Sequence, residues 1–230
     1  MHIFLLVLGS FLYAAVLLDS FQTIILPRRP VARFRLTSLF YIATWTPWTW
    51  IAHLFDRRKQ EQIYSYYGPL SLLMLFVVWA ISLVIAFGFM YFGLHAPFSD
   101  PLHPTTALGH LRTCFYVSGS TLFTLGLGDV VPISHATRFL IVTEAGTGLG
   151  FIALVIGYLP VLYSAFSARE MEVALLDARA GSPPTAGELL LRHHFNGGDA
   201  ALNKLLAEWE RWSATMLETH ISYQIGRAHV

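Results

Sequence analysis

The chain has 230 residues, of which 55% are hydrophobic and only 13% are charged, and its formal net charge is +1. In soluble proteins roughly a quarter of the residues are charged. This composition therefore predicts an integral membrane protein and excludes the strongly basic surface of a nucleic-acid-binding protein. The single cysteine, Cys114, cannot form a disulfide within the chain, so the fold does not depend on an oxidising compartment.

The N-terminal region predicts a first membrane helix. Residues Ile3 to Leu18 are almost wholly apolar, and a continuation to Leu26 makes the segment long enough to cross a bilayer core of about 30 Å. We expect an uncleaved anchor, because no Lys or Arg precedes the apolar run as in a secretory signal. Asp19 is expected to be hydrated at the membrane interface, whereas a carboxyl group facing the helix bundle would need a partner.

The segment from Leu36 to Phe55 leaves the topology open. Basic clusters flank it at Arg28–Arg35 and Arg57–Lys59, and a membrane-crossing helix between them would put these clusters on opposite sides, which the positive-inside rule disfavours. Three tryptophans around Pro47 are typical of the headgroup level. We therefore predict an interfacial or re-entrant helix, three spans and an outside N-terminus. Four spans with an inside N-terminus remain the alternative.

Two long apolar segments follow. Leu70 to Leu94 contains no formal charge and predicts an outer membrane helix, and Arg138 to Phe166 predicts an inner one. Between them, Leu111 to Phe123 predicts a helix too short to cross the membrane. The expected fold class is an all-α membrane protein, with an anchor and interfacial segment at residues 1–68 and a two-helix pore-like domain at 69–167.

The C-terminal region has a more polar composition and predicts a helical cytoplasmic tail at residues 168–224. Apolar residues at three- and four-residue steps give a helix from Ala200 to Ser222 one apolar face. That face packs either within the tail or against another subunit. The last six residues, Ile225 to Val230, resemble the translation of a sequencing adapter, so we expect the natural chain to be longer.

The stretch from Ser118 to Pro132 places exposed backbone between the two long apolar segments. Non-helical backbone at membrane depth is tolerated only where protein buries it or where it lines a wet cavity. Carbonyl groups that replace the water of a dehydrated cation must point at one axis, which requires a backbone of alternating handedness. Glycine adopts that backbone with little strain, and Gly126 and Gly128 supply it. The stretch therefore predicts an ion-selecting loop.

The run Thr124-Leu-Gly-Leu-Gly-Asp129 resembles the selectivity filter of potassium channels, whose usual form is Thr-Val-Gly-Tyr-Gly-Asp. The order of long helix, short helix, filter, Pro132, Arg138 and second long helix is similar to that of the two-span potassium channels. The resemblance implies that K⁺ is coordinated by the carbonyls of Thr124, Leu125, Gly126 and Leu127, with Gly128 completing the filter. It also implies a homotetramer in the cell membrane, in contact with lipid, with a cytoplasmic tail, no enzymatic activity and no cofactor beyond the transported ion.

Four residues are expected to support the filter: Tyr116, Ser120, Asp129 and Glu144. Support is needed because Leu127 stands where the family has a tyrosine, and leucine packs but cannot hydrogen-bond. Glu144 is an intramembrane carboxyl group and therefore a functional candidate. We expect it behind the filter, hydrogen-bonded to a polar residue of the short helix (Ser118, Ser120, Thr121 or Tyr116). The alternative is a neutral carboxyl group bonded to helix backbone.

The inner helix contains candidate gating residues. By the resemblance, Gly148 falls where the family has its hinge glycine. Leu149, Ile152 and Ile156 follow at three- and four-residue steps and predict apolar rings that gate by dewetting, and Pro160 removes a helix hydrogen bond. Packing against lipid or other helices is the alternative for each. On the outer side, histidines offer proton or zinc modulation: His95, His103, His110 and His135.

Two other functions match part of the sequence. A weakly selective monovalent cation channel would keep the same loop with a less rigid support. An intramembrane aspartyl protease carries Gly-x-Gly-Asp, which Gly126 to Asp129 matches, but it needs a second facing aspartate. The remaining acidic candidates are Asp19 and Glu144, and neither lies in the expected setting. No predicted helix carries arginine at every third position, so voltage sensing is not predicted. The sequence leaves open which stimulus gates the protein and which ligand its tail binds.

Overall fold

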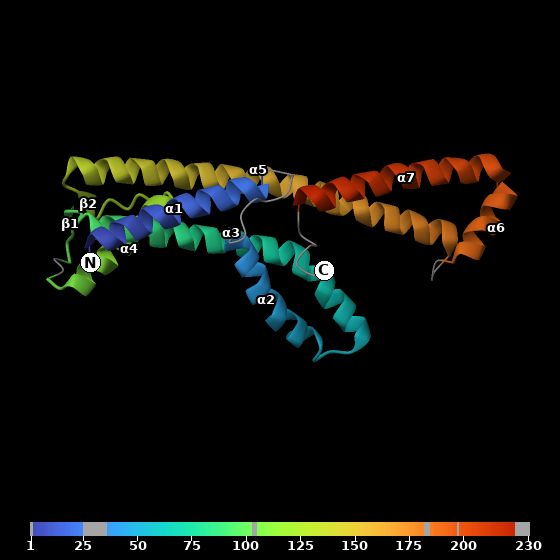
Figure 1. Ribbon diagram of the computed structural model, residues 1–230, viewed down its shortest axis with the longest axis horizontal. Coiled ribbons are helices and arrows are strands. Elements are labelled where there is room, and N and C mark those ends of the chain that lie inside the picture. The colour runs from blue at the N-terminus through green and yellow to red at the C-terminus, as the bar shows by residue number, and fades with distance from the viewer. Residues whose placement is uncertain (1, 25–35, 103–104, 182–184, 197, 224–230) are drawn as a thin grey trace. The chain divides into compact units, whose positions relative to one another are not determined.

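The computed structural model describes residues 2–24, 36–102, 105–181, 185–196 and 198–223. Its helices are α1 (His2–Ile24), α2 (Leu36–Ala52), α3 (Arg57–Gly93), α4 (Ala107–Leu122), α5 (His135–Ala180), α6 (Ala186–Asn196) and α7 (Gly198–Tyr223) (Figure 1). Strands β1 (Phe98–Ser99) and β2 (Val131–Pro132) form one short antiparallel ribbon. The described residues up to Val155 form one compact unit and those from Ile156 onward form a second. Three predicted features lie outside the described residues. They are the first basic cluster (within residues 25–35), His103 and the expected adapter sequence (residues 225–230).

Three of the described helices are long and apolar enough to cross a membrane: His2–Ile24, Tyr66–Gly93 and His135–Pro160. This confirms the all-α membrane fold. Helix α2, with 17 residues, is not among the three, which agrees with the prediction of three spans.

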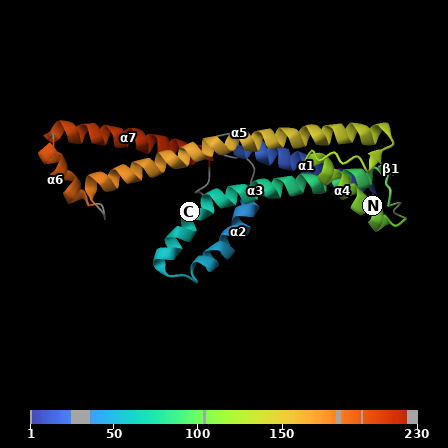
Figure 2. The same ribbon diagram turned by 180° about the vertical axis from the view of Figure 1, so that it is seen from behind.

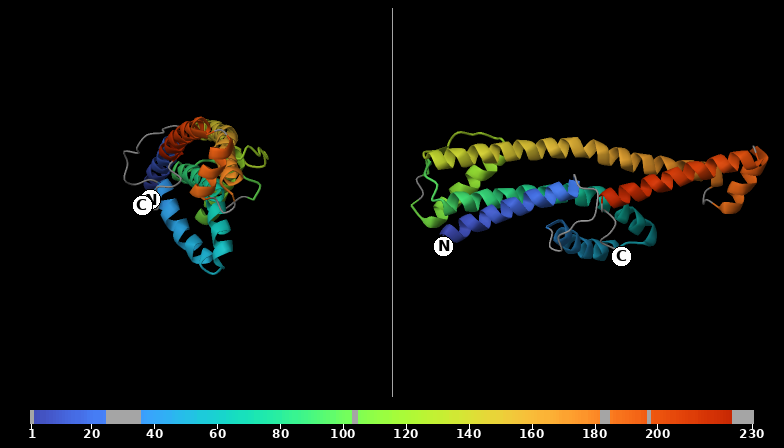
Figure 3. Two further views of the ribbon diagram at one scale, coloured as in Figure 1. Left: turned by 90° about the vertical axis from the view of Figure 1, so that its right-hand side faces the viewer. Right: turned by 45° about the horizontal axis from the view of Figure 1, so that its top comes forward.

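Helix α1 lies antiparallel along the second half of α3 (Figure 3). Its last turns carry Asp19, which is only 5% exposed. One oxygen of Asp19, Oδ2, accepts hydrogen bonds from the backbone N of Thr37 (3.0 Å), from the hydroxyl of Thr37 (2.6 Å) and from Nε1 of Trp79 (2.9 Å). The expectation of a hydrated Asp19 is therefore wrong. The carboxyl group is buried because α2 and α3 supply donors in place of water.

Helix α2 folds back along the first half of α3. Nε1 of Trp48 donates to the carbonyl of Ile63 (3.2 Å), and the hydroxyls of Thr44 and Tyr67 lie 2.9 Å apart. Helix α3 therefore begins at Arg57, thirteen residues before the predicted start at Leu70, and continues through Gly68. Packing against α2 stabilises a segment that contains the adjacent Gly68 and Pro69, and tertiary contacts commonly override local propensity in this way.

Helix α4 and the ribbon close the first unit. Thr106 caps α4, since its side chain accepts a hydrogen bond from the backbone N of Gly109 (3.1 Å). This cap starts the helix four residues before the predicted Leu111. The buried core here joins α3, α4 and α5: Phe87, Tyr91, Phe92, Ala96, Cys114, Val117 and Leu140. Figure 2 shows these elements from the opposite side.

The second unit consists of the end of α5 together with α6 and α7. Helix α5 does not end at Phe166 as predicted but continues to Ala180, because the change to polar composition after Phe166 brings no helix breaker. Helix α6 turns the chain at the end of α5, and α7 then runs back along it (Figure 1). The predicted helix at 200–222 is confirmed as α7. Its apolar residues Leu202, Leu205 and Trp209 pack within the tail around Ala180 and Leu189, whereas Leu206 and Leu217 are exposed.

Candidate functional site

The site begins where α4 runs into the loop at residues 124–128, which we call the glycine loop. The backbone N of Phe123 donates to Gly119 O (3.1 Å), that of Thr124 to Thr121 O (3.0 Å) and that of Leu125 to Ser120 O (2.8 Å). These bonds tie the first residues of the loop to the last turn of α4. The carboxyl end of that helix, with its partial negative charge, therefore lies beside the start of the loop.

The glycine loop has a backbone of alternating handedness. Thr124, Gly126 and Gly128 have positive φ angles of +57°, +58° and +75°, and Leu125 and Leu127 between them do not. The two glycines adopt this region freely, as the sequence predicted. Thr124 does so at a cost of about 1–2 kcal/mol, and the sequence gives no sign of that strain. Alternation turns successive carbonyl groups so that they can face a common axis.

The glycine loop is also free of internal hydrogen bonds over most of its length. Within the described chain, the amides of Gly126, Leu127 and Gly128 donate no backbone hydrogen bond, and the carbonyls of residues 124–128 accept none. All five residues are exposed, Leu125 by 63% and Leu127 by 61%. The carbonyl oxygens are therefore available to a ligand, and the exposed leucines show where another molecule could cover the loop.

The residues that follow the loop are anchored twice. Oη of Tyr116 on α4 donates to Oδ2 of Asp129 (2.6 Å), and this hydrogen bond raises the pKa of Tyr116. Beyond it, β2 pairs with β1, and the backbone N of Ile133 donates to Pro97 O (3.1 Å). The structure thus brings two of the four predicted support residues, Tyr116 and Asp129, into contact.

Glu144 on α5 is fully buried behind α4. Oη of Tyr91 donates to its Oε2, and Oγ of Ser118 donates to its Oε1, each at 2.5 Å. Oγ of Ser118 also lies 3.0 Å from the carbonyl of Val84. We call Tyr91, Ser118 and Glu144 the Glu144 cluster. It joins α3, α4 and α5, and it includes one of the four partners that the sequence offered for Glu144.

Ser120 does not join this cluster among the described residues; its backbone carbonyl holds Leu125 instead. Tyr91 is the member that sequence reasoning missed. It lies in an apolar run of α3 far from the loop in sequence, and an aromatic residue near the end of a membrane helix ordinarily indicates an interface position.

Gly148 lies one turn beyond Glu144, against the end of α4. A Cβ atom at this position would overlap the carbonyl oxygen of Leu122, two residues before Thr124. The missing side chain therefore lets α5 touch the backbone of α4 directly. Of the residues predicted to line a gate, Leu149, Ile156 and Pro160 are exposed and Ile152 is half-buried, and α5 stays helical through all of them.

The carboxyl groups that a protease would need are held by different partners. Asp129 is exposed and accepts from Tyr116, Glu144 is buried in its cluster, and Asp19 is bound to Thr37 and Trp79. The sequence did not single out Asp100, which lines the same cavity as Asp129; its carboxyl group accepts hydrogen bonds from the Thr113 hydroxyl and from the backbone N of Leu102.

Residues 73–164 match the family model described as "Ion channel". This segment forms an ion-channel pore domain. The pore domain holds the second half of α3, the whole of α4, the glycine loop and the first part of α5, and therefore all three members of the Glu144 cluster. Neither the curated proteins nor the solved structures contain a match to the chain.

Proposed function

We propose that this protein is a potassium-selective channel in which four copies of the chain surround one pore. The observation that carries the proposal is the glycine loop, whose alternating backbone and free carbonyl groups fit a pore domain of the ion-channel family. A cation leaving water needs several oxygen ligands at once, and stacked rings of carbonyls supply them.

In this proposal K⁺ is coordinated by the carbonyls of Thr124, Leu125, Gly126 and Leu127, and by the hydroxyl of Thr124 at the inner end. Gly128 completes the loop. One chain supplies one loop, so a closed ring of four chains is needed to surround an ion. The exposed Leu125 and Leu127 are then covered by neighbouring subunits rather than by water.

Support for the loop comes from two hydrogen-bonded groups rather than from a tyrosine in the loop itself. Tyr116 holds Asp129 at the outer end, and the Glu144 cluster holds α4 against α3 and α5. Ser120 contributes through its carbonyl. These contacts replace the rigidity that Leu127 cannot provide by hydrogen bonding.

The inner helix forms the gate. Gly148 is the point at which it can bend, and Leu149, Ile152, Ile156 and Pro160 extend toward a cytoplasmic tail in a protein of the cell membrane. Apolar rings below the cavity close a pore by excluding water.

Reconstitution into liposomes with a K⁺ gradient tests the proposal. We expect K⁺ flux with little Na⁺ flux from the wild-type protein, and loss of flux in Gly126→Ala. Alanine is strained at the φ angle of +58°. Its Cβ would meet no atom within 4 Å, so the effect comes from the backbone and not from a clash. Gly187→Ala is the matched control, since its Cβ also meets no atom and its backbone is ordinary helix.

Absence of cation flux from folded protein, or full flux in Gly126→Ala, would refute the channel. Comparable K⁺ and Na⁺ flux would replace it by the weakly selective cation channel. The subunit number is checked separately by native mass spectrometry.

A further inference from the structure

Helix α1 packs on the pore domain by backbone contact. A Cβ atom at Gly9 would lie 2.5 Å from the carbonyl oxygen of Ala86 on α3, and one at Gly93 would lie 2.6 Å from the backbone N of Leu6 on α1. Small residues at such crossings let membrane helices approach closely and hold them by dispersion forces. Helix α1 therefore packs closely against α3 as part of the first unit and is more than an anchor in the membrane.

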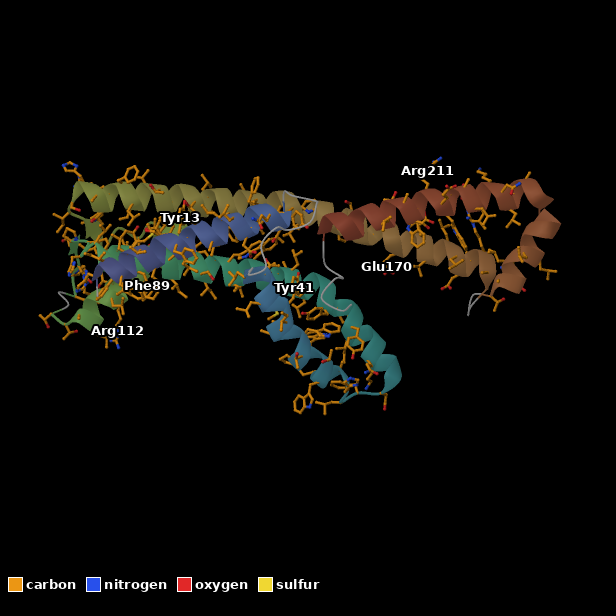
Figure 4. The ribbon with its side chains drawn as sticks, viewed as in Figure 1. Tyr13, Tyr41, Phe89, Arg112, Glu170 and Arg211 are labelled. Carbon is orange, nitrogen blue, oxygen red and sulfur yellow. The ribbon has the colours of Figure 1, made fainter. Side chains whose placement is uncertain are left out.

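Tyr13 extends from α1 past α3 to the inner helix. Its ring packs edge-on against Phe87 of α3, with centroids 5.1 Å apart and planes at 64°. Its hydroxyl lies 3.3 Å from Oγ1 of Thr147 on α5. Figure 4 labels Tyr13 at this position on α1.

The direction of this hydrogen bond follows from the other contact of Thr147. Oγ1 of Thr147 donates its only proton to the carbonyl of Thr143 at 2.8 Å. It can therefore only accept from Tyr13, whose hydroxyl is the donor. The contact is polar, lies between two apolar helices and joins two half-buried side chains.

Thr147 occupies a sensitive point of α5. The next residue, Gly148, touches the carbonyl of Leu122 at the end of α4, and Glu144 lies one turn before it in the buried cluster. A shift of α5 at Thr147 would therefore be transmitted to the backbone that precedes Thr124 and the glycine loop.

We propose that Tyr13 is a positioning residue of the pore, through which α1 holds the inner helix at Thr147 and so sets the balance between open and closed states. This inference rests on the proposed channel function for its electrical readout. It assigns to α1 a regulatory role in addition to anchoring the chain.

The test is a double-mutant cycle on single-channel open probability in planar bilayers, with Tyr13→Phe, Thr147→Val and both together. Each single variant removes one hydrogen bond between membrane helices, and we expect this loss to change the ratio of open to closed states about threefold. The double variant is expected to change the ratio no further than either single one, and Thr147→Ser is expected to behave as the wild type. Tyr66→Phe is the matched control, because that tyrosine is 68% exposed.

The same double-mutant cycle is also measured by thermal unfolding in detergent. Unfolding does not depend on ion conduction, so this measurement tests the contact between Tyr13 and Thr147 separately from the channel function. Coupling of Tyr13 and Thr147 in unfolding together with unchanged open probability would show a purely structural contact and overturn the regulatory role. Additive effects of the two substitutions in both measurements would overturn the contact itself. A wild-type protein without conductance would instead refute the channel function.

Discussion

Among the buried carboxyl groups of the first unit are those of Asp19, at 5% exposure, and Glu144, at 0%. Both are satisfied by hydroxyl or ring N–H donors from other helices. Asp19 accepts from Thr37 and Trp79 and so links α1 to α2 and α3. Glu144 accepts from Tyr91 and Ser118 and so links the helices of the pore domain to one another.

Similar chemistry serves two different purposes in these two carboxyl groups. Asp19 also binds the backbone N of Thr37 in the first turn of α2, so it fixes the start of a helix outside the pore-domain match. Glu144 binds Ser118, one turn before the end of α4, which leads into the glycine loop. Loss of Asp19 should therefore loosen the added helices, and loss of Glu144 should disturb the loop.

The largest effect is expected for Glu144→Leu. Leucine leaves the Tyr91 hydroxyl without a partner in a buried site, which costs about 1–3 kcal/mol, and it releases α4 behind the loop. We expect a lower unfolding temperature and a reduced K⁺ over Na⁺ permeability ratio, measured by detergent melting and by reversal potentials.

Glu144→Gln should have an intermediate effect, because its amide keeps one acceptor oxygen. If Glu144→Gln left conductance, selectivity and inactivation untouched, the supporting role of Glu144 would be abandoned.

A second prediction concerns Asp19→Ala. It removes the acceptor of the buried Trp79 ring N–H, so the free energy of unfolding should fall by about 1–3 kcal/mol, while the permeability ratio stays at the wild-type value. Asp56→Ala is the control, since Asp56 is exposed and its side chain makes no cap hydrogen bond. A change of selectivity as large as that of Glu144→Leu would remove the distinction between the two carboxyl groups.

A smaller effect is expected for Tyr91→Phe. The substitution removes one donor to Glu144 and leaves Ser118 in place, so the expected loss is about 0.6 kcal/mol, the average for hydrogen bonds between membrane helices. Detergent melting measures it, with Tyr163→Phe, 73% exposed, as the control. Equal effects of the two substitutions would argue against the Glu144 cluster.

The smallest effect is a pH dependence that arises from His110 in the first turn of α4. Burial lowers the pKa of His110, and His95 and His2 lower it further. The unfolded chain then binds more protons than the folded one. The contribution of neutral His110 to the free energy of unfolding is therefore complete above the ordinary pKa of 6.5, and it is lost as the pH falls through the lower pKa of the folded state. Melting at pH 7.5 and 5.5 should show a smaller difference in His110→Gln than in wild type.

His135→Gln is the control for that measurement, because His135 is exposed. An unchanged pH dependence in His110→Gln would show that other groups carry it.

Much of the fold follows from local sequence. Apolar length predicted the three membrane helices, and the tryptophan-rich segment predicted a helix that does not span. The helix ends were predicted less well, because the start of α3 depends on α2 and the extent of α5 depends on the absence of a breaker. The positive φ angles of Gly126 and Gly128 were predictable, since a carbonyl-lined loop needs them and only glycine adopts them at little cost.

The partners of the buried polar groups were decided by tertiary structure. The sequence offered four candidates for Glu144, but Tyr91 comes from another helix, and no local pattern marks a tyrosine in an apolar run as a hydrogen-bond donor. In the same way, only packing shows that Asp19 is enclosed by α2 and α3 and that Tyr13 reaches Thr147. Local chemistry sets which groups need a partner when water is excluded, and the way the helices cross determines which groups meet.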